Sequence, residues 1–230
     1  MEYLTNALLV GLLTSGSLVG SQIDLKKNPV KINYTDPYDT KYEYTITRTP
    51  NEKCKNVQLN VDTIWGGDFA NQNVPNECKK SFVTTAGHIS PMKINDEIKT
   101  YGELEVIEFM QKAQSSNKNL LLIDARLPIW YHKLTIPTAL NIPFPNFDHA
   151  KNPAEFDDML ESIGVTQKDG VYDFSNAKTL LLFCNGIWCP QSTWAIENLL
   201  KLGYPANKLN WYRGGMYSWT QSNLTTIIPK

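Results

Sequence analysis

The clearest feature of the hydrophobic pattern is a pair of short, continuous apolar runs in the second half of the chain, residues 119–124 and 179–183. Runs of this length are typical of strands that are buried on both faces of a parallel sheet. Apolar residues also recur at helical spacing in three segments, which are residues 103–112, 155–163 and 192–202. Strands that alternate with helices of this length predict an α/β layer built on a parallel sheet.

Several smaller signals refine this α/β pattern. Residues 138–144 predict a short strand between the two apolar runs, and Gly203 stands where the last helix should end. The helix over residues 103–112 is expected to bury one face, formed by Leu104, Ile107, Phe109 and Met110. Three tryptophans are expected to pack between helices and sheet, namely Trp194, Trp211 and Trp219.

The part of the chain before this region has a different pattern. Residues 29–83 are rich in turn-forming residues, Tyr and Thr, and residues 42–47 and 57–61 alternate as half-buried strands do. This segment is too short and too polar to build a large core alone. We therefore predict a small β-rich N-terminal unit over residues 21–89 and an α/β domain over residues 90–230.

The first residues resemble an export signal. Residues 7–13 form an apolar run, and small residues follow it up to Ser21. This order is typical of a secretory signal peptide, although Glu2 stands where a basic residue is usual. We expect residues 1–20 to be a signal peptide and the mature protein to be periplasmic or secreted. The alternative is an N-terminal helix that docks on the domain.

Composition narrows the function classes. The 230 residues are 42% hydrophobic and 20% charged, and the formal net charge is -1. This balance gives no electrostatic reason to expect nucleic acid or an anionic membrane as a partner. No stretch approaches the roughly 18–20 consecutive apolar residues of a membrane span. The histidines, His88, His132 and His149, show no metal-ligand spacing, so we predict neither a metal site nor a cofactor.

Two of the four cysteines, Cys54 and Cys78, lie in the N-terminal unit. In an exported protein we expect them to form a structural disulfide, worth about 3 kcal/mol. In a cytosolic protein they would be buried free thiols. Neither has a partner at the short spacing that metal-binding cysteines use.

The other two cysteines lie in the loop that follows the second apolar run. Cys184 comes directly after that strand, and a helix begins near Ser192. Backbone N–H groups and the helix dipole at such a position stabilise a thiolate, and ligands of open α/β sheets bind off the same strand ends. The alternative is that Cys184 is an inert buried thiol.

Four segments, in order, resemble the rhodanese family. They are Leu122-Ile123-Asp124-Ala125-Arg126, Ile136-Pro137-Thr138-Ala139-Leu140-Asn141-Ile142-Pro143, the strand, cysteine and helix around Cys184, and Arg213-Gly214-Gly215-Met216-Tyr217-Ser218-Trp219. The resemblance extends over about residues 90–228. It implies a rhodanese-like parallel sheet flanked by helices.

The resemblance also implies sulfur transfer. The Cys184 thiolate would take a sulfane sulfur from a donor such as thiosulfate or a persulfide, hold it as a persulfide, and pass it to a thiol or cyanide. Relay through one nucleophile predicts ping-pong kinetics. The backbone N–H groups from Asn185 to Gln191 would surround the outer sulfur. The expected substrate-binding residues are Asn185, Gly186, Ile187, Trp188, Gln191, Ser192 and Arg126.

The loop departs from the family pattern in ways that bear on its substrate. It runs from Cys184 to Gln191, which is longer than the loops of the sulfurtransferases and of the related phosphatases. The Arg that commonly ends such loops is absent, and Gln191 is its nearest counterpart. A phosphate or arsenate dianion would lack its bidentate cation, which counts against phosphatase chemistry. Thr135 and Thr138 replace a His and a Gly of the family.

Cys189 leaves three hypotheses open. It could resolve a persulfide or sulfenate on Cys184, form a redox dithiol with Cys184 without sulfur transfer, or pack as a small apolar residue beside Trp188. Trp188 itself could wall the pocket or anchor the loop. For Arg126 we favour a structural ion pair with Asp124 over a substrate contact. We predict a sulfurtransferase; the alternatives are a thiol–disulfide redox protein and a non-catalytic rhodanese-like module that binds a partner.

Overall fold

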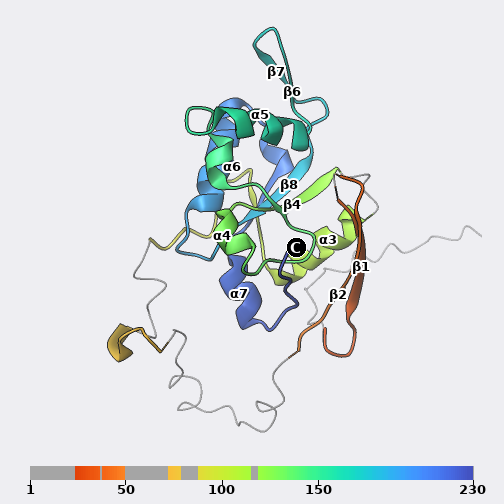
Figure 1. Cartoon of the computed structure of the whole chain (residues 1–230), viewed down its shortest axis with the longest axis vertical. Helices are drawn as coiled ribbons and strands as arrows, with labels where there is room; N and C mark the ends of the chain where they lie inside the picture. The colour runs from red at the N-terminus through yellow and green to blue at the C-terminus, as the bar shows by residue number, and fades with distance from the viewer. Residues whose placement is uncertain (1–23, 37, 50–71, 79–87, 115–118, 230) are drawn as a thin grey trace, which may run out of the picture.

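The computed structural model describes residues 24–36, 38–49, 72–78, 88–114 and 119–229 (Figure 1). Three features of the sequence prediction lie outside the described residues. They are the signal peptide expected over residues 1–20, the strand expected at residues 57–61, and Cys54.

Five parallel strands form the central sheet in the order β3-β9-β8-β4-β5. Their bounds are Lys99–Tyr101 (β3), Leu120–Asp124 (β4), Leu140–Asn141 (β5), Thr179–Phe183 (β8) and Leu209–Tyr212 (β9). The register pairs Asp124 with Phe183, so β4 and β8 end at the same level. Because β5 lies beyond β4 and β9 lies beyond β8, the strand order reverses between these two strands. In open α/β sheets, ligands bind outside the carboxyl ends of the strands at such a switch point.

Helices cover both faces of the sheet. The α-helices are α3 (Glu103–Ala113), α4 (Pro128–Tyr131), α5 (Pro153–Ser162), α6 (Gln191–Leu202) and α7 (Gly215–Gln221), and the short 3-10 helices are η2 (Asn76–Cys78), η3 (Phe144–Phe147) and η4 (Ala206–Lys208). Side chains alternate along β8: Leu180 and Leu182 pack with α5 and α6, whereas Leu181 and Phe183 pack with α3 and α7. Burial on both faces explains why this strand is a continuous apolar run.

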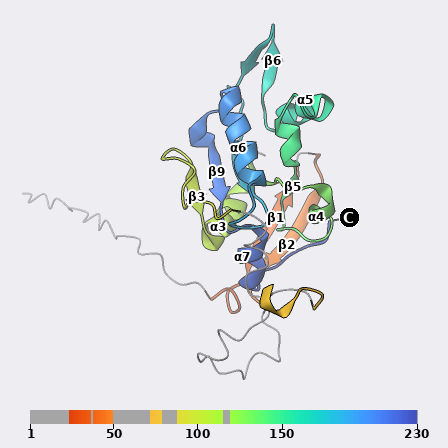
Figure 2. The ribbon, with the colours of Figure 1, turned by 90° about the vertical axis from the view of Figure 1, so that its left-hand side faces the viewer.

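Two antiparallel hairpins are added to the α/β core. They are β1 (Val30–Thr35) with β2 (Lys41–Ile46), and β6 (Thr166–Lys168) with β7 (Val171–Asp173). Ile32 and Ile46 of the first hairpin are fully buried in the same apolar cluster as α3, beside which the hairpin lies in Figure 1. The second hairpin projects from the opposite end of the molecule (Figures 1 and 2). The predicted fold class is confirmed: a parallel sheet flanked by helices, with a small β-rich unit at the N-terminus.

The predicted long elements are present with bounds within two residues of those expected, and β8 has the expected bounds. Gly203 ends α6 in the left-handed region, with φ at 96°, where a side chain would be strained. The strand expected at residues 138–144 is shorter, because only Leu140 and Asn141 pair with β4.

Two burial predictions are wrong. Leu104 is 37% exposed, because it lies beside the buried face of α3, which is formed by Val106, Ile107, Phe109, Met110 and Ala113 and so includes the predicted Ile107, Phe109 and Met110. Trp194 is 47% exposed and does not pack between helix and sheet. Its ring lies 5.4 Å from that of Phe144 in η3, since Ala195 and Ile196 occupy the sheet-facing side of α6. Trp211 and Trp219 are buried as predicted.

Candidate active site

The carboxyl ends of β4 and β8 bring two distant parts of the sequence together at the switch point. Asp124 is the last residue of β4, and Cys184 directly follows the last residue of β8. The Ala125 N–H group donates to the Phe183 carbonyl at 3.0 Å and continues the pairing one residue past β4. Arg126 and the loop from Cys184 to Pro190 therefore lie at the same edge of the sheet.

The start of α7 supports the first residues of this loop. The Met216 and Tyr217 N–H groups donate to the carbonyls of Cys184 and Asn185 at 3.0 and 2.8 Å. Gly215 makes this approach possible: an added Cβ would lie 2.3 Å from the Cys184 carbonyl oxygen, and φ at this residue is +57°. No other residue type fits this position without displacing the loop.

The segment before β3 supports the middle of the loop. The Ser90 N–H group donates to the Ile187 carbonyl at 2.8 Å. Ser90 is held in turn by Arg213, whose guanidinium donates to the carbonyls of Ser90 and Pro91 at 2.8 and 2.9 Å. The loop is thus fixed from two sides by backbone contacts.

The Cys184 sulfur lies in a buried, polar environment. The residue is 2% exposed, its Sγ–H donates to the Cys189 carbonyl at 2.9 Å, and the Ser192 hydroxyl donates to its sulfur at 3.3 Å. Ser192 is fully buried at the start of α6, and its oxygen accepts a bond from Trp211 Nε1 at 3.1 Å. Burial, followed by the adjacent Cys189 thiolate, raises the pKa of the Cys184 thiol well above its ordinary value.

Cys189 lies beside Cys184, and its pKa is shifted in the opposite direction. A hydrogen bond from the Cys184 thiol, the backbone N–H groups of Gln191 and Asn185, and the charge of Arg126 together lower the pKa of Cys189 to about 6. The N–H groups that we expected around the outer sulfur of a Cys184 persulfide thus include two that hold the Cys189 sulfur. In the reduced pair, these interactions favour the negative charge on Cys189 over Cys184.

Thiolate absorbance should detect this asymmetry. We expect the thiolate absorbance of the wild type, after that of Cys189→Ser is subtracted, to titrate with a midpoint near pH 6. The reason is that the Cys189 charge is lost as the pH falls through its pKa of about 6. In Cys184→Ala the midpoint should rise towards the ordinary value of 9.0, since the largest stabilising contact is gone. A difference that titrates near 9.0 in the wild type would contradict the assignment.

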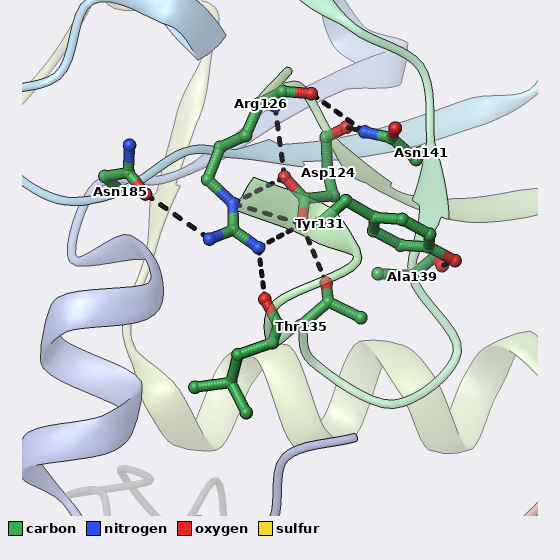
Figure 3. Close-up of polar contacts among 8 residues, drawn as sticks. Asp124, Arg126, Tyr131, Thr135, Ala139, Asn141 and Asn185 are labelled. Carbon is green, nitrogen blue, oxygen red and sulfur yellow. Dashed lines mark hydrogen bonds and ion pairs between the residues drawn. The ribbon is translucent and has the colours of Figure 1, made fainter. Parts of the chain in front are cut away.

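Arg126 and Asp124 form a buried, bidentate ion pair at the end of β4 (Figure 3). Arg126 Nη2 lies 2.6 Å from Asp124 Oδ2, and Nε lies 2.9 Å from Oδ1. The guanidinium also donates to the Leu134 carbonyl at 2.6 Å and to Asn185 Oδ1 at 3.3 Å, while the Thr135 hydroxyl donates to Asp124 at 2.7 Å. The guanidinium is engaged on all sides, as the structural hypothesis requires, and it also touches the loop through Asn185.

Two further loop residues, Gly186 and Trp188, pack against each other, and Trp188 also packs against α7. The Trp188 ring lies 5.1 Å from the Tyr217 ring, and a Cβ on Gly186 would lie 2.5 Å from the Trp188 ring. These contacts favour Trp188 as an anchor of the loop. Gln191 is the first residue of α6, and its Oε1 is buried without a hydrogen-bond partner.

The structure brings together Cys184, Cys189, Arg126 and the expected loop residues, but the sequence interpretation missed the supports. Gly215, Ser90 and Thr135 all contact or hold the site. The Gly-Gly pair was a usable signal for Gly215, because a glycine there permits close backbone approach. Nothing in the pattern around Ser90 indicated its role.

The structure describes only some of the residues named in the other site predictions. Cys78 ends η2, whereas Cys54 is not described, so the disulfide stays a prediction. Among the described residues, no three His, Cys, Asp or Glu side chains are grouped as a metal site would need. Within the same residues, no helix has the length and apolar character to cross a membrane.

A family model described as "Rhodanese-like domain" matches residues 108–222, which is half of the 230-residue chain. No curated protein matches the chain.

Solved structures with similarity to this chain include the following three. A "rhodanese with anions from E. coli" is 20% identical with a TM-score of 0.32, over 48% of this chain and 99% of that one. A thiosulfate sulfurtransferase from Pseudomonas aeruginosa is 17% identical with a TM-score of 0.37, and the match covers 58% of this chain and 21% of that one. The BH2092 protein from Bacillus halodurans is 18% identical with a TM-score of 0.36, and the match covers 66% of this chain and 86% of that one.

Proposed function

Since this chain belongs to the rhodanese-like family, we propose that it is a sulfurtransferase whose Cys184 carries sulfane sulfur as a persulfide. One observation carries the proposal: Cys184 lies at the carboxyl end of β8, at the switch point, with donors of Ser192 directed at its sulfur. These donors favour the thiolate that must attack thiosulfate, and they act against the burial that raises the pKa of Cys184. The donor is thiosulfate or a persulfide, and the acceptor is a thiol or cyanide.

The transfer follows from the chemistry of a thiolate nucleophile. Cys184 attacks the sulfane sulfur of thiosulfate, an S–S bond to Cys184 forms, and the S–S bond of thiosulfate breaks as sulfite leaves with the electron pair. The acceptor thiolate or cyanide then attacks the outer sulfur, and the Cys184 thiolate leaves. Phosphoryl chemistry is disfavoured because Arg126 is occupied by Asp124, Leu134 and Asn185, and the loop itself has no cationic side chain.

Sulfite release tests the proposal. The reduced protein, freed of reductant and mixed with thiosulfate, is expected to release one sulfite per chain in a first turnover. Cys184→Ala and Cys184→Ser are expected to release none, with circular dichroism as the check that both variants fold. Release of sulfite by both variants, or no release by the wild type, would reject Cys184 as the sulfur carrier.

A thiol–disulfide redox protein is the second candidate, and the direct contact between the two cysteines, in which the Cys184 Sγ–H group donates to the Cys189 carbonyl at 2.9 Å, favours it. Such a protein would exchange electrons with a dithiol and release no sulfite. A protein that does neither is a non-catalytic binding module. The proposal also includes export, on the support of the apolar run in residues 7–13, and a disulfide between Cys54 and Cys78.

A further inference from the structure

We propose that Cys189 is a second catalytic residue: it takes the proton of Cys184 and then displaces the transferred sulfur from Cys184 as hydrosulfide, which closes a Cys184–Cys189 disulfide. This inference deepens the proposed function and rests on it. It assigns the fate of the sulfur in this loop and the class of co-reactant that the protein then needs.

The position of Cys189 is the first argument. The Cys184 Sγ–H group donates to the Cys189 carbonyl at 2.9 Å, so the two residues are in direct contact within one loop. The turn that places it there is closed by the Cys189 N–H group, which donates to the Gly186 carbonyl at 2.9 Å. A sulfur added to Cys184 would therefore form beside a second sulfur that is already in place.

Charge is the second argument. The Cys184 thiol, then the N–H groups of Gln191 and Asn185 and the guanidinium of Arg126, favour negative charge on Cys189 and lower its pKa to about 6. A thiolate on the residue that the Cys184 Sγ–H group already contacts can accept the Cys184 proton. Cys184 is thereby activated although burial raises its own pKa.

Access is the third argument. Cys184 and Cys189 are 2% and 6% exposed, so every external reactant, donor or acceptor, must enter a closed loop to reach the Cys184 sulfur. Cys189 needs no entry, and an intramolecular nucleophile in contact has a large advantage in effective concentration over one from solution. An acceptor in the same loop is therefore favoured over a second reactant from solution.

The steps balance without an added oxidant. Cys184, as its thiolate, takes the sulfane sulfur and releases sulfite, while Cys189 holds the proton. The Cys189 sulfur then attacks the inner sulfur of the Cys184 persulfide, the Cys189–Cys184 bond forms, and the sulfane sulfur leaves as hydrosulfide with the proton. The sulfane sulfur is reduced and the two cysteines are oxidised, so a dithiol reductant must restore the pair before the next turnover.

A single-turnover experiment on the full-length reduced protein tests this, without oxygen and with free reductant removed. After addition of thiosulfate, the wild type is expected to release one sulfite and one hydrosulfide per chain. The peptide over residues 179–201, which contains both cysteines between two lysine cleavage sites, should lose the mass of two hydrogens. A second turnover should require dithiothreitol.

Cys189→Ser and Cys189→Ala are the discriminating variants. Each is expected to release hydrosulfide at less than a tenth of the wild-type yield and to retain the mass of one added sulfur on residues 179–201, which Cys184→Ala should not gain. The double variant Cys54→Ser and Cys78→Ser is the matched cysteine control, and it should behave as the wild type.

The outcomes separate the two proposals. Sulfite with a retained sulfur and no hydrosulfide in the wild type would overturn the role of Cys189 and leave the sulfurtransferase intact. A retained sulfur located on Cys189 would overturn it equally, because the outer sulfur would then have been attacked. Absence of sulfite would overturn both, and since this measurement needs only the wild type, misfolding of a variant does not affect it.

Discussion

Gly215→Ala is expected to lower the rate of sulfite release from thiosulfate by about 100-fold or more, the cost of displacing reacting groups by about 1 Å. The added Cβ would lie 2.3 Å from the Cys184 carbonyl oxygen and 2.8 Å from the Gly186 nitrogen. Both are backbone atoms of the loop, so the clash is relieved only if the loop or the start of α7 moves. Stopped-flow measurement of sulfite release would give the rate.

Gly170→Ala is the matched control for this prediction. Gly170 has a φ of +79°, similar to the +57° of Gly215, but an added Cβ there meets no atom within 4 Å. It lies in the turn between β6 and β7, far from the loop in Figure 1. We expect a loss of about 1–2 kcal/mol of stability from the left-handed backbone and an unchanged rate. Wild-type rates in both variants would show that the loop tolerates displacement.

Asp124→Ala is expected to lower the free energy of unfolding by about 3–5 kcal/mol, because it leaves a buried Arg126 charge without its partner. Asp124 and Arg126 are 0% and 3% exposed, so water cannot replace the carboxylate. The same substitution removes the acceptor of the Thr135 hydroxyl. Urea denaturation followed by tryptophan fluorescence would measure the loss.

Two further variants give this prediction its controls. Asp124→Asn keeps the shape of the side chain and removes its charge, so a similar loss would assign the effect to charge. Glu108→Ala removes a partner of Lys112 from an exposed pair on α3, and it should cost no more than about 1 kcal/mol. A loss of this small size for Asp124→Ala would mean that the pair is not structural.

Long buried elements were predictable because a single physical cause, burial on both faces, produces their pattern. β8 and β4 are continuous apolar runs, and the sequence predicts them within one residue. β9 escaped prediction because Asn210 interrupts its apolar run; the side chain is buried and donates to the Leu180 carbonyl at 3.1 Å, which only the neighbouring strand makes possible. Edge strand β3 has three residues, too few to show a period.

The chemistry of the site was predictable only in part, because only some of it follows from a pattern along the chain. Position after a buried strand identified the Cys184 loop, since the strand and the helix that follows are visible in the sequence. The opposite pKa shifts of Cys184 and Cys189 were not visible, because they depend first on how deeply Cys184 is buried and on the interaction between the two side chains, and then on which backbone N–H groups point at which sulfur. Spacing along the chain does not reveal any of these.

The support that Ser90 gives to the loop has a consequence for dividing the protein into functional pieces. The motifs that identify the family lie between Leu122 and Trp219, yet the Ile187 peptide group is tied to Ser90, more than thirty residues before the first of them. A fragment cut at the edge of the motifs would keep Cys184 and lose the Ser90 contact that holds its loop. The smallest fragment that retains the whole candidate site therefore includes Ser90.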